Sequence, residues 1–203
     1  MYIKSIKIRN LGLRSVQNVC SNMYNFTINR TNFTKDEVWL VQHYPVFTIG
    51  VQENKIKFLI ENNIPVVFSN RGGKITYHAP GQLIMYFLIN LSRRKITVRK
   101  LISCMYDTIL STLKYFSINS YLLNNFPGIY VNNKKICSIG LRIKNGCSFH
   151  GMSLNINMNL LPFRYIYACG NDFESTQIAD IQPNLCFKTI QRVLIQKIKK
   201  NFL

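Results

Sequence analysis

One long stretch of this chain carries apolar residues at helical spacing, and short apolar runs fill much of the remainder. The long stretch is Thr97–Phe116, whose apolar side chains recur every three or four positions and predict an amphipathic helix. The short runs end at glycine, proline or asparagine, as strands do. Strands in runs with helices between them favour an α+β fold, with a mixed sheet and helices on one side.

The same signals give the other elements that we expect. The expected strands are Ile3–Ile8, Glu37–Gln42, a buried run at Ile64–Phe68, Lys74–Tyr77, Gln82–Leu91 and Ser153–Asn157. A hairpin is expected to join Gly128–Val131 to Lys135–Ile143, because Asn132 and Asn133 tolerate turn conformations. The other expected helices are a weak one at Leu13–Ile28, a short turn at Ile56–Glu61 and a final helix after Pro183 and Asn184.

The length of 203 residues predicts a single domain spanning 1–203. No apolar run approaches the roughly 20 residues that a membrane helix needs. The first nine residues mix charged with apolar side chains, whereas a secretory signal needs an unbroken apolar stretch. We therefore expect a cytoplasmic protein that does not enter a membrane.

The charge is strongly positive, because 26 Lys and Arg against 8 Asp and Glu give +18. A nucleic-acid-binding module is one interpretation, since basic patches neutralise phosphates. The basic residues are spread along a chain crowded with Ile, Asn and Lys, however, and we favour compositional drift as their source. Whatever its origin, the charge favours an acidic protein partner.

The chain has six cysteines, and no two are spaced as C-x-x-C. Zinc and thioredoxin-type sites therefore have little support, and the cysteines are expected to be thiols. His43, His78 and His150 also lack the spacing of metal ligands, and we expect no metal.

Three segments look unlike ordinary core. The first, 71–82, places two glycines, Arg71 and His78 after an apolar run, where a backbone approaches a ligand closely or a glycine hairpin turns. It matches neither a P-loop nor a dinucleotide-binding motif. The second, 134–151, begins with two lysines. Lys134 suits the turn, which leaves Lys135 to point inward or to remain an ordinary surface lysine.

The third segment, 167–171, places Cys169 before a glycine at a chain bend. A nearby ammonium lowers the pKa of a thiol because it favours the thiolate. Cys169 and Lys135 are therefore candidates for a nucleophile and its activating base. The alternative is a buried cysteine and an unrelated surface lysine, and these residues by themselves favour that alternative.

Together these segments resemble the lipoyl(octanoyl) transferase family, the octanoyl-[acyl-carrier-protein]:protein N-octanoyltransferases. The pattern R-G-G-x-x-T-x-H-x-P-G-Q occurs at 71–82, and P-G-[IV]-[YW]-V followed by K-I-x-[SA]-[IL]-G-[LV]-[RK] at 127–142. H-G-x-[AS]-L-N-[IV]-N occurs at 150–157, and the family's P-C-G appears as Ala168-Cys169-Gly170. The resemblance covers about residues 10 to 185. It implies an α+β domain, a mixed β-sheet flanked by helices like the catalytic domain of biotin and lipoate protein ligases.

The resemblance also implies an activity and its partners. The octanoyl group of octanoyl-acyl carrier protein would pass to a lysine of a lipoyl domain, with no ATP and no cofactor. The acceptors would be the lipoyl domains of 2-oxoacid dehydrogenase complexes and the glycine cleavage H protein. We expect a monomer that binds no nucleic acid. The alternatives are an ATP-dependent lipoate–protein ligase of the same fold, a nucleic-acid-binding module, and a degenerate chain without activity.

The resemblance assigns residues to these roles. Cys169 would carry the octanoyl thioester, and Lys135 would depress the pKa of that thiol. The acyl pocket would be lined by Arg71, Gly72, Gly73, Lys74, Ile75, Thr76, Tyr77, His78, Ser138, Ile139, Gly140, Gly151, Met152 and Ser153. We expect glycines 72, 73, 140 and 151 to give the acyl chain room.

Donors near the thioester oxygen would stabilise the oxyanion, and the backbone N–H groups around Cys169 and Gly170 are candidates, as is His78. The chain departs from the family pattern at two positions. Ala79 replaces a glycine, but an extended conformation before Pro80 suits alanine. Ala168 replaces a proline, which removes a fixed φ before Cys169.

Overall fold

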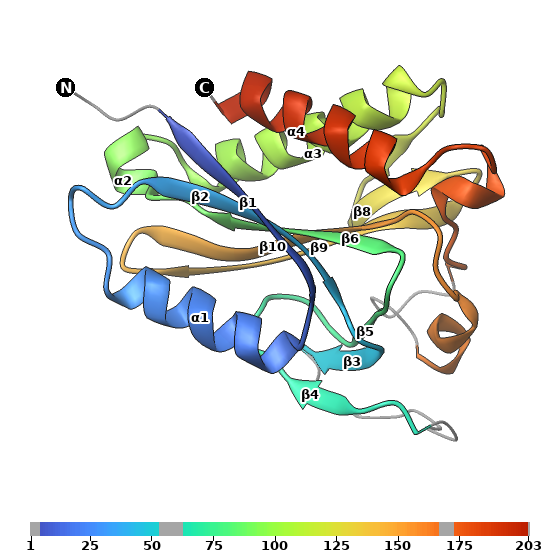
Figure 1. Ribbon diagram of the computed structural model, residues 1–203, viewed down its shortest axis with the longest axis horizontal. Helices are drawn as coiled ribbons and strands as arrows, with labels where there is room; N and C mark the ends of the chain where they lie inside the picture. Colours follow the sequence, from blue (N-terminus) through green and yellow to red (C-terminus); the bar gives the residue numbers. More distant parts are fainter. Residues whose placement is uncertain (1–4, 53–62, 167–172, 203) are drawn as a thin grey trace.

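The computed structural model describes residues 5–52, 63–166 and 173–202, and a seven-stranded mixed sheet crosses its centre (Figure 1). The strand order is β1-β2-β6-β10-β9-β8-β7. The bounds are β1 Ile6–Arg14, β2 Asp36–His43, β6 Gln82–Leu88, β7 Tyr121–Leu123, β8 Phe126–Val131, β9 Lys134–Lys144 and β10 Cys147–Asn155. β1 and β2 are parallel and are connected through helix α1 (Val16–Ile28), whereas the other neighbours are antiparallel.

A second, three-stranded sheet lies at one end of the first, in the order β4-β3-β5 (Figure 1). Its strands are β3 (Val46–Ile49), β4 (Val66–Phe68) and β5 (Thr76–His78). It follows β2 directly along the chain and leads back into β6. The segment between β4 and β5 carries the start of the 71–82 motif and β5 carries its middle, so this small sheet determines where that motif lies.

Helices cover both faces of the large sheet, which corrects the expectation of helices on one side. Helices α3 (Val98–Tyr115) and α4 (Phe187–Phe202) cover one face, and α1 covers the other (Figure 1). A short helix α2 (Leu91–Arg94) follows β6, and two 3-10 helices, η1 (Leu161–Tyr165) and η3 (Ile178–Asp180), follow β10. The expected α+β class, a mixed sheet flanked by helices, is confirmed.

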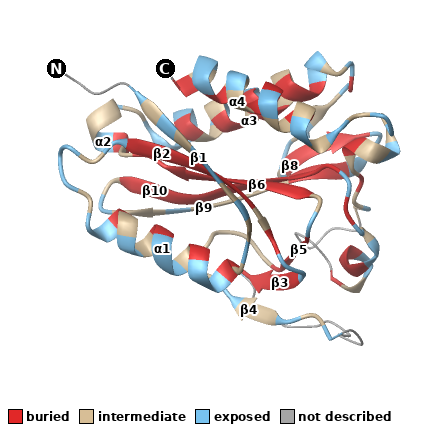
Figure 2. Ribbon diagram, in the orientation of Figure 1, coloured by how far each residue is buried: buried red, intermediate tan, exposed pale blue. Residues whose placement is uncertain are grey.

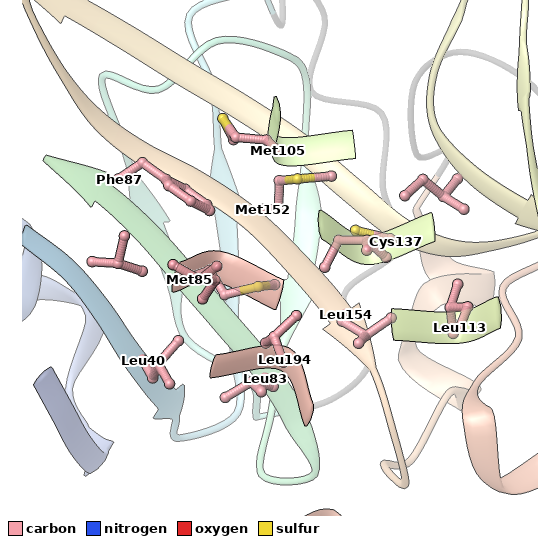
Figure 3. Packing of buried hydrophobic residues seen from close by; sticks show 14 of the residues in the cluster. Leu40, Leu83, Met85, Phe87, Met105, Leu113, Cys137, Met152, Leu154 and Leu194 are labelled. Atoms are coloured by element: carbon pink, nitrogen blue, oxygen red, sulfur yellow. The ribbon is translucent and has the colours of Figure 1, made fainter. Parts of the chain in front are cut away.

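The central strands are buried on both sides, as the red strands of Figure 2 show. In β2, Val38 and Leu40 pack under α3 and α4, while Trp39 and Val41 pack under α1. The same alternation in β6 places Met85 beside Leu194 of α4 (Figure 3). Because both faces of these strands are buried, their sequences are continuous apolar runs.

Local signals determine where several elements begin. Thr97 caps α3, because its side chain accepts a hydrogen bond from the N–H of Lys100. Ser15 caps α1 in the same way, so the weak helix expected from Leu13 begins three residues later. Asn132 and Asn133, with φ of 49° and 59°, form the expected turn between β8 and β9, because a type I′ hairpin turn requires positive φ at both positions and asparagine tolerates it.

Other expectations are met in part. The run at Ile64–Phe68 contains only the short strand β4, and it is not buried, because Phe68 is 75% exposed. The first strand continues to Arg14 through a bulge at Gly12, and β3, β7 and α2 were not expected. The turn expected at Ile56–Glu61 lies outside the described residues.

Across the described ranges, no helix has the length and apolar character to cross a membrane.

Candidate active site

A pocket lies between the α1 face of the large sheet and the segment that leads from β4 to β5. Its walls come from α1, β3, β5, β6, β9 and β10, and it encloses about 50 Å³ of free space. The lining contains the cations Arg71 and Lys74, and no carboxylate occurs among the lining residues that the structure describes. The pocket therefore suits an uncharged or anionic group better than a cationic one.

Most of the residues expected to bind substrate line this pocket. They are Arg71, Gly73, Lys74, Ile75, Thr76, His78, Ser138, Ile139, Gly140, Gly151, Met152 and Ser153. Tyr77 does not line it, because side chains alternate along β5 and its ring packs away from the pocket against Phe47 and Phe163. Gly72 does not line it either, and its N–H donates to the carbonyl of Leu141 on β9 at 2.9 Å.

Two glycines of these motifs, Gly140 and Gly151, make room for the protein's own backbone, and the expectation that the glycines give the acyl chain room stays a prediction. A Cβ on Gly140 would lie 2.7 Å from the carbonyl oxygen of Gly72. A Cβ on Gly151 would lie 1.9 Å from the carbonyl oxygen of Met85. The absent side chains let the 69–75 segment and β6 approach closely, and that approach forms the pocket wall.

Arg71 lines the pocket and is hydrogen-bonded to Thr48 of β3. Its Nη2 donates to the carbonyl oxygen of Thr48 at 2.7 Å and to Thr48 Oγ1 at 2.9 Å. Its Nε also donates to Thr48 Oγ1, at 3.2 Å, and its Nη1 donates to the carbonyl of Gly72. This geometry fixes the guanidinium and places a positive charge among the polar groups of the pocket.

The three histidines of the chain are all buried and uncharged. Burial lowers the pKa of His43 to about 4 and the pKa values of His78 and His150 to about 3. Arg71 lowers the pKa values of His78 and His150 further, because it opposes a second positive charge. Near neutral pH these rings serve as neutral hydrogen-bonding groups.

His78 is not placed to donate a hydrogen bond to the oxyanion. Its Nδ1 contacts Gln82 Oε1 at 2.7 Å, and because an amide oxygen only accepts, Nδ1 carries the proton. In the neutral ring Nε2 is then an acceptor, and it contacts Thr48 Oγ1 at 3.2 Å. The one N–H of the ring already has a partner.

Several lining residues were missed by sequence reasoning. Cys20 and Val16 of α1 close one side, and Tyr86 of β6 lies beside them. His43 Nε2 contacts the Tyr86 hydroxyl at 2.8 Å, and His43 Nδ1 contacts the carbonyl of Arg14, so the phenol donates to His43. Burial raises the pKa of Cys20 to about 11 despite the opposing effect of Arg71, so this thiol is inert at neutral pH. None of the motifs contains Val16, Cys20 or Tyr86.

One polar atom of the lining stands out because of its surroundings. Within the described ranges, the buried Oγ1 of Thr76 has no hydrogen-bonding partner. Thr76 lies opposite Thr48 in the β3–β5 pair, and its side chain lines the pocket. A buried hydroxyl without a partner among the described residues is a candidate to bind a polar atom of a ligand.

Lys135 points inward and Lys134 outward. Lys135 is only 4% exposed, and its Nζ lies 5.4 Å from the ring centroid of Tyr130. Lys134 forms an ion pair with Glu174 at 2.6 Å on the surface. Gly128 leaves space for the inward lysine, because a Cβ there would lie 3.1 Å from Lys135 Cε.

The backbone of Lys135 joins β9 to residues 174–176, which follow the 167–171 segment. Its N–H donates to the carbonyl of Glu174 at 2.8 Å, and its carbonyl accepts from the N–H of Thr176 at 2.9 Å. These two bonds form a parallel bridge with Ser175. The chain just beyond residues 167–172 is thereby fixed beside Lys135.

The predicted nucleophile Cys169, and with it Ala168, lies outside the described residues. Ala79, the other departure from the family pattern, is not among the residues with positive φ, so its methyl group is accommodated without strain.

Burial raises the pKa of Cys137 far above its usual range, although Lys135 opposes this rise, and marks that thiol as a core residue. In the described ranges, no cluster of three His, Cys, Asp or Glu is arranged to hold a metal ion.

Comparison with known proteins decides the family. The profile of the lipoyl protein ligase A/B catalytic domain matches residues 21–199. The chain belongs to this family. An octanoyltransferase of Buchnera aphidicola subsp. Baizongia pistaciae is 70% identical over 202 residues, with both chains fully covered. An octanoyltransferase of Shigella flexneri is 45% identical over 199 residues, covering 98% of this chain and 93% of that protein.

Solved structures of the family and its neighbours share the fold. A lipoate-protein ligase A bound with ATP superposes with a TM-score of 0.80 at 13% identity, covering 96% of this chain and 84% of that one. A biotin protein ligase of Aquifex aeolicus gives 0.55 at 12% identity, covering 100% and 70%. At such identities the likeness concerns the fold, and it confirms the expected relation to the ligase catalytic domains.

Proposed function

We propose that residues 1–203 form a single catalytic domain that transfers an octanoyl group from a carrier-protein thioester to a lysine of a lipoyl domain. The expectation of an octanoyltransferase is confirmed by curated relatives of that name, including one at 70% identity over the full chain. The chain is thus an acyltransferase of lipoate synthesis. The observation that best supports the proposed mechanism is Lys135, buried beside the segment that follows Cys169 in the sequence.

The proposed reaction has two transfers. The Cys169 thiolate attacks the donor thioester, a new thioester forms on Cys169, and the donor thiol leaves with a proton. The amine of the acceptor lysine then attacks, the amide forms, and the Cys169 thiolate is restored. Because one thioester replaces another, the first step is nearly balanced in free energy and needs no ATP. Lys135 would favour the thiolate and exchange protons with the reacting groups.

The strand register suggests how the acyl chain lies. One set of residues paired across β9, β10 and β6 lies along the pocket and consists of Ser138, Ser153 and Ile84. The next set on this face lies two residues, about 7 Å, farther from Lys135 and consists of Gly140, Gly151 and Tyr86. The thioester would lie toward the first set and the apolar tail toward Tyr86 and Cys20. The hydroxyl of Thr76 is a candidate partner for the carbonyl oxygen.

The donor would be octanoyl-acyl carrier protein. The acceptors would be the lipoyl domains of 2-oxoacid dehydrogenase complexes and the glycine cleavage H protein. The net charge of +18 favours encounter with acidic partners, so rates should fall with added salt. The monomeric state and the cytoplasmic location stay predictions.

The decisive experiment is the intact mass of the protein after incubation with octanoyl-carrier protein without ATP. We expect a gain of one octanoyl group that hydroxylamine removes and that Cys169→Ala abolishes. Cys186→Ala is the control, because Cys186 is exposed and backbone N–H groups of Thr189 and Lys188 lower the pKa of its thiol. An adduct lost with Cys186 would contradict the assignment. A gain that requires octanoate and ATP would favour the ligase alternative.

A further inference from the structure

A line of hydrogen bonds starts at Arg71 in the pocket and runs through buried side chains. Arg71 donates twice to Thr48 Oγ1, so the Thr48 hydroxyl proton is left to donate to His78 Nε2. His78 Nδ1–H then donates to Gln82 Oε1 at 2.7 Å. Each bond determines whether the next group must donate or accept. The guanidinium therefore fixes which ring nitrogen of His78 carries the proton and how the Gln82 amide is oriented.

The same line continues across the sheet to the backbone of Lys135. Gln82 Nε2 donates to Asn155 Oδ1 at 2.9 Å, and Asn155 Nδ2 donates to the carbonyl of Thr176 at 2.9 Å. The N–H of Thr176 in turn donates to the carbonyl of Lys135. Gln82, Asn155 and Thr176 are each at most 5% exposed. Because its oxygen accepts from Gln82, the Asn155 amide has one orientation, with N–H toward Thr176.

We propose that Asn155 is a positioning residue for the transfer reaction, which holds the 174–176 segment against β9 and so keeps Lys135 in place. The inference rests on the proposed function, in which Lys135 lowers the pKa of the Cys169 thiol. Asn155 acts through the backbone of Thr176 and does not line the pocket. The line also ties Lys135 to Arg71, so the acyl pocket and the activating lysine share one hydrogen-bonded support.

The geometry favours a role for Asn155 in positioning Lys135 over a general contribution to the stability of the core. The bonds on either side of Ser175 use both backbone polar groups of Lys135, so a shift of Thr176 moves the origin of the lysine side chain. The far end of that side chain lies in the space over Gly128 and the ring of Tyr130. Its stem is therefore confined at two points, and the bond from Asn155 to Thr176 supports the first of them.

The test uses Asn155→Leu, which keeps the approximate volume and removes both polar atoms. We expect single-turnover acylation by octanoyl-carrier protein to need a higher pH, with the profile shifted upward by about one unit or more. At pH values below both midpoints that shift means about a tenfold lower rate. Lys135→Met marks the largest shift available. Asn155→Ser, too short to reach Thr176, serves if the leucine variant does not fold.

Ser148→Ala is the matched control. Ser148 is buried on the same strand, and its hydroxyl donates to the carbonyl of Phe87 at 2.6 Å and accepts from the N–H of Ile89. It lies at the opposite end of β10 and does not line the pocket. We expect it to lower Tm and leave the pH profile unchanged. A profile that shifts equally in both variants, or in neither, would overturn the inference.

Amide hydrogen exchange of the resting protein separates this inference from the proposed function. Asn155→Leu should speed exchange at Lys135 and Thr176 by about tenfold or more, while Ser148→Ala should not. Unchanged exchange would overturn the inference whatever the enzyme does. A parent protein that exchanges as expected and forms no acyl-enzyme would instead overturn the proposed function, and with it the catalytic part of this inference.

Discussion

The strands β2 and β6 lie side by side, and both of their ends carry buried polar groups that are held in different ways. At one end the carboxylate of Asp36 accepts from Arg30 at 2.5 Å and from Arg93 and Arg94 at 2.6 Å. At the other end Gln82 joins neutral side chains in the line that leads from Arg71 to Thr176. One end is fixed by charge and the other by the direction of neutral hydrogen bonds.

The difference follows from what each end connects. The Asp36 cluster joins the residues after α1, the short helix α2 and, through Arg94 and the carbonyl of Phe202, the end of α4. The other end forms a pocket whose described lining contains no carboxylate. A carboxylate there would raise the pKa of a nearby thiol and would compete for Lys135. Neutral groups support the site without opposing its proposed chemistry.

Among single substitutions, the largest expected effect comes from removing the charge of Asp36. Asp36→Asn would leave three guanidinium groups around a neutral amide, and we expect the free energy of unfolding to fall by about 3–5 kcal/mol in urea titrations. Activity per folded molecule should not change. Glu37→Gln is the control, because Glu37 bonds Trp39 at 2.6 Å but its cationic partners Lys7 and Arg9 are largely exposed. It should cost about 1 kcal/mol. Equal losses would contradict the comparison.

Lowering the pH should destabilise mainly the end of β2 and β6 that is held by neutral hydrogen bonds. The folded pKa values of the three histidines, about 3 to 4, lie below the ordinary value of 6.5. Their stabilising contribution is therefore complete above 6.5 and is lost as pH falls from 6.5 toward those values, because only the unfolded chain takes up protons. The loss is about 1.4 kcal/mol per pH unit for each histidine.

Unfolding in urea at a series of pH values measures this slope. His43→Gln removes one of the three groups and should flatten the slope between 6.5 and about 4 by roughly a third. A variant whose slope matches that of the parent would show that His43 is not held neutral. Asp36→Asn should leave the histidine slope unchanged, since its cluster lies at the opposite end of the strands.

A smaller effect is expected where the line of hydrogen bonds meets Arg71. Thr48→Val keeps the shape of the side chain and removes the acceptor of two Arg71 bonds and the donor to His78. We expect a loss of about 1–3 kcal/mol in stability and a lower kcat. Thr76→Val, on the facing strand, removes a hydroxyl without a described partner, so stability should hold and KM should rise. The reverse pattern would contradict the assignments.

The smallest expected effect is on selectivity. Cys20→Phe would fill the pocket beside Tyr86, and we expect kcat/KM for octanoyl relative to a shorter acyl group to fall by about tenfold. Cys20→Ala should shift the preference the other way, toward longer chains. Steady-state kinetics with a series of acyl-carrier proteins measures both. An unchanged ratio in Cys20→Phe would place the acyl tail elsewhere.

The elements that sequence reasoning located were those with a strong local signal. The helix expected at 97–116 forms at 98–115, because its period and its Thr97 cap are both local. For Lys135 the local argument left two alternatives open, an inward or a surface side chain, and the structure shows the inward one, with Lys134 in the exposed position. The short strands β3 and β7 were missed, because four or three residues paired to distant partners leave little pattern of their own.

The site was less accessible to sequence reasoning than the fold. Motifs located the segments around Arg71, Ser138 and Gly151, but Cys20 and Tyr86 reach the pocket only because α1 and β6 pack together. Sequence reasoning also did not show that the protein's own backbone approaches Gly140 and Gly151 closely. The supporting role of Asn155 depends on a contact 21 residues away along the chain, which no local pattern predicts.

The first strand has a consequence for assembly. β1 is an edge strand, and an unpaired edge is a template for the backbone of another molecule. Its exposed positions include Lys7, Arg9 and Arg14, and the bulge at Gly12 interrupts the regular spacing of its backbone groups. A second copy that added itself along this edge would bring like charges together on an irregular strand. β1 thus discourages sheet-to-sheet aggregation in a chain rich in isoleucine and other aggregation-prone residues.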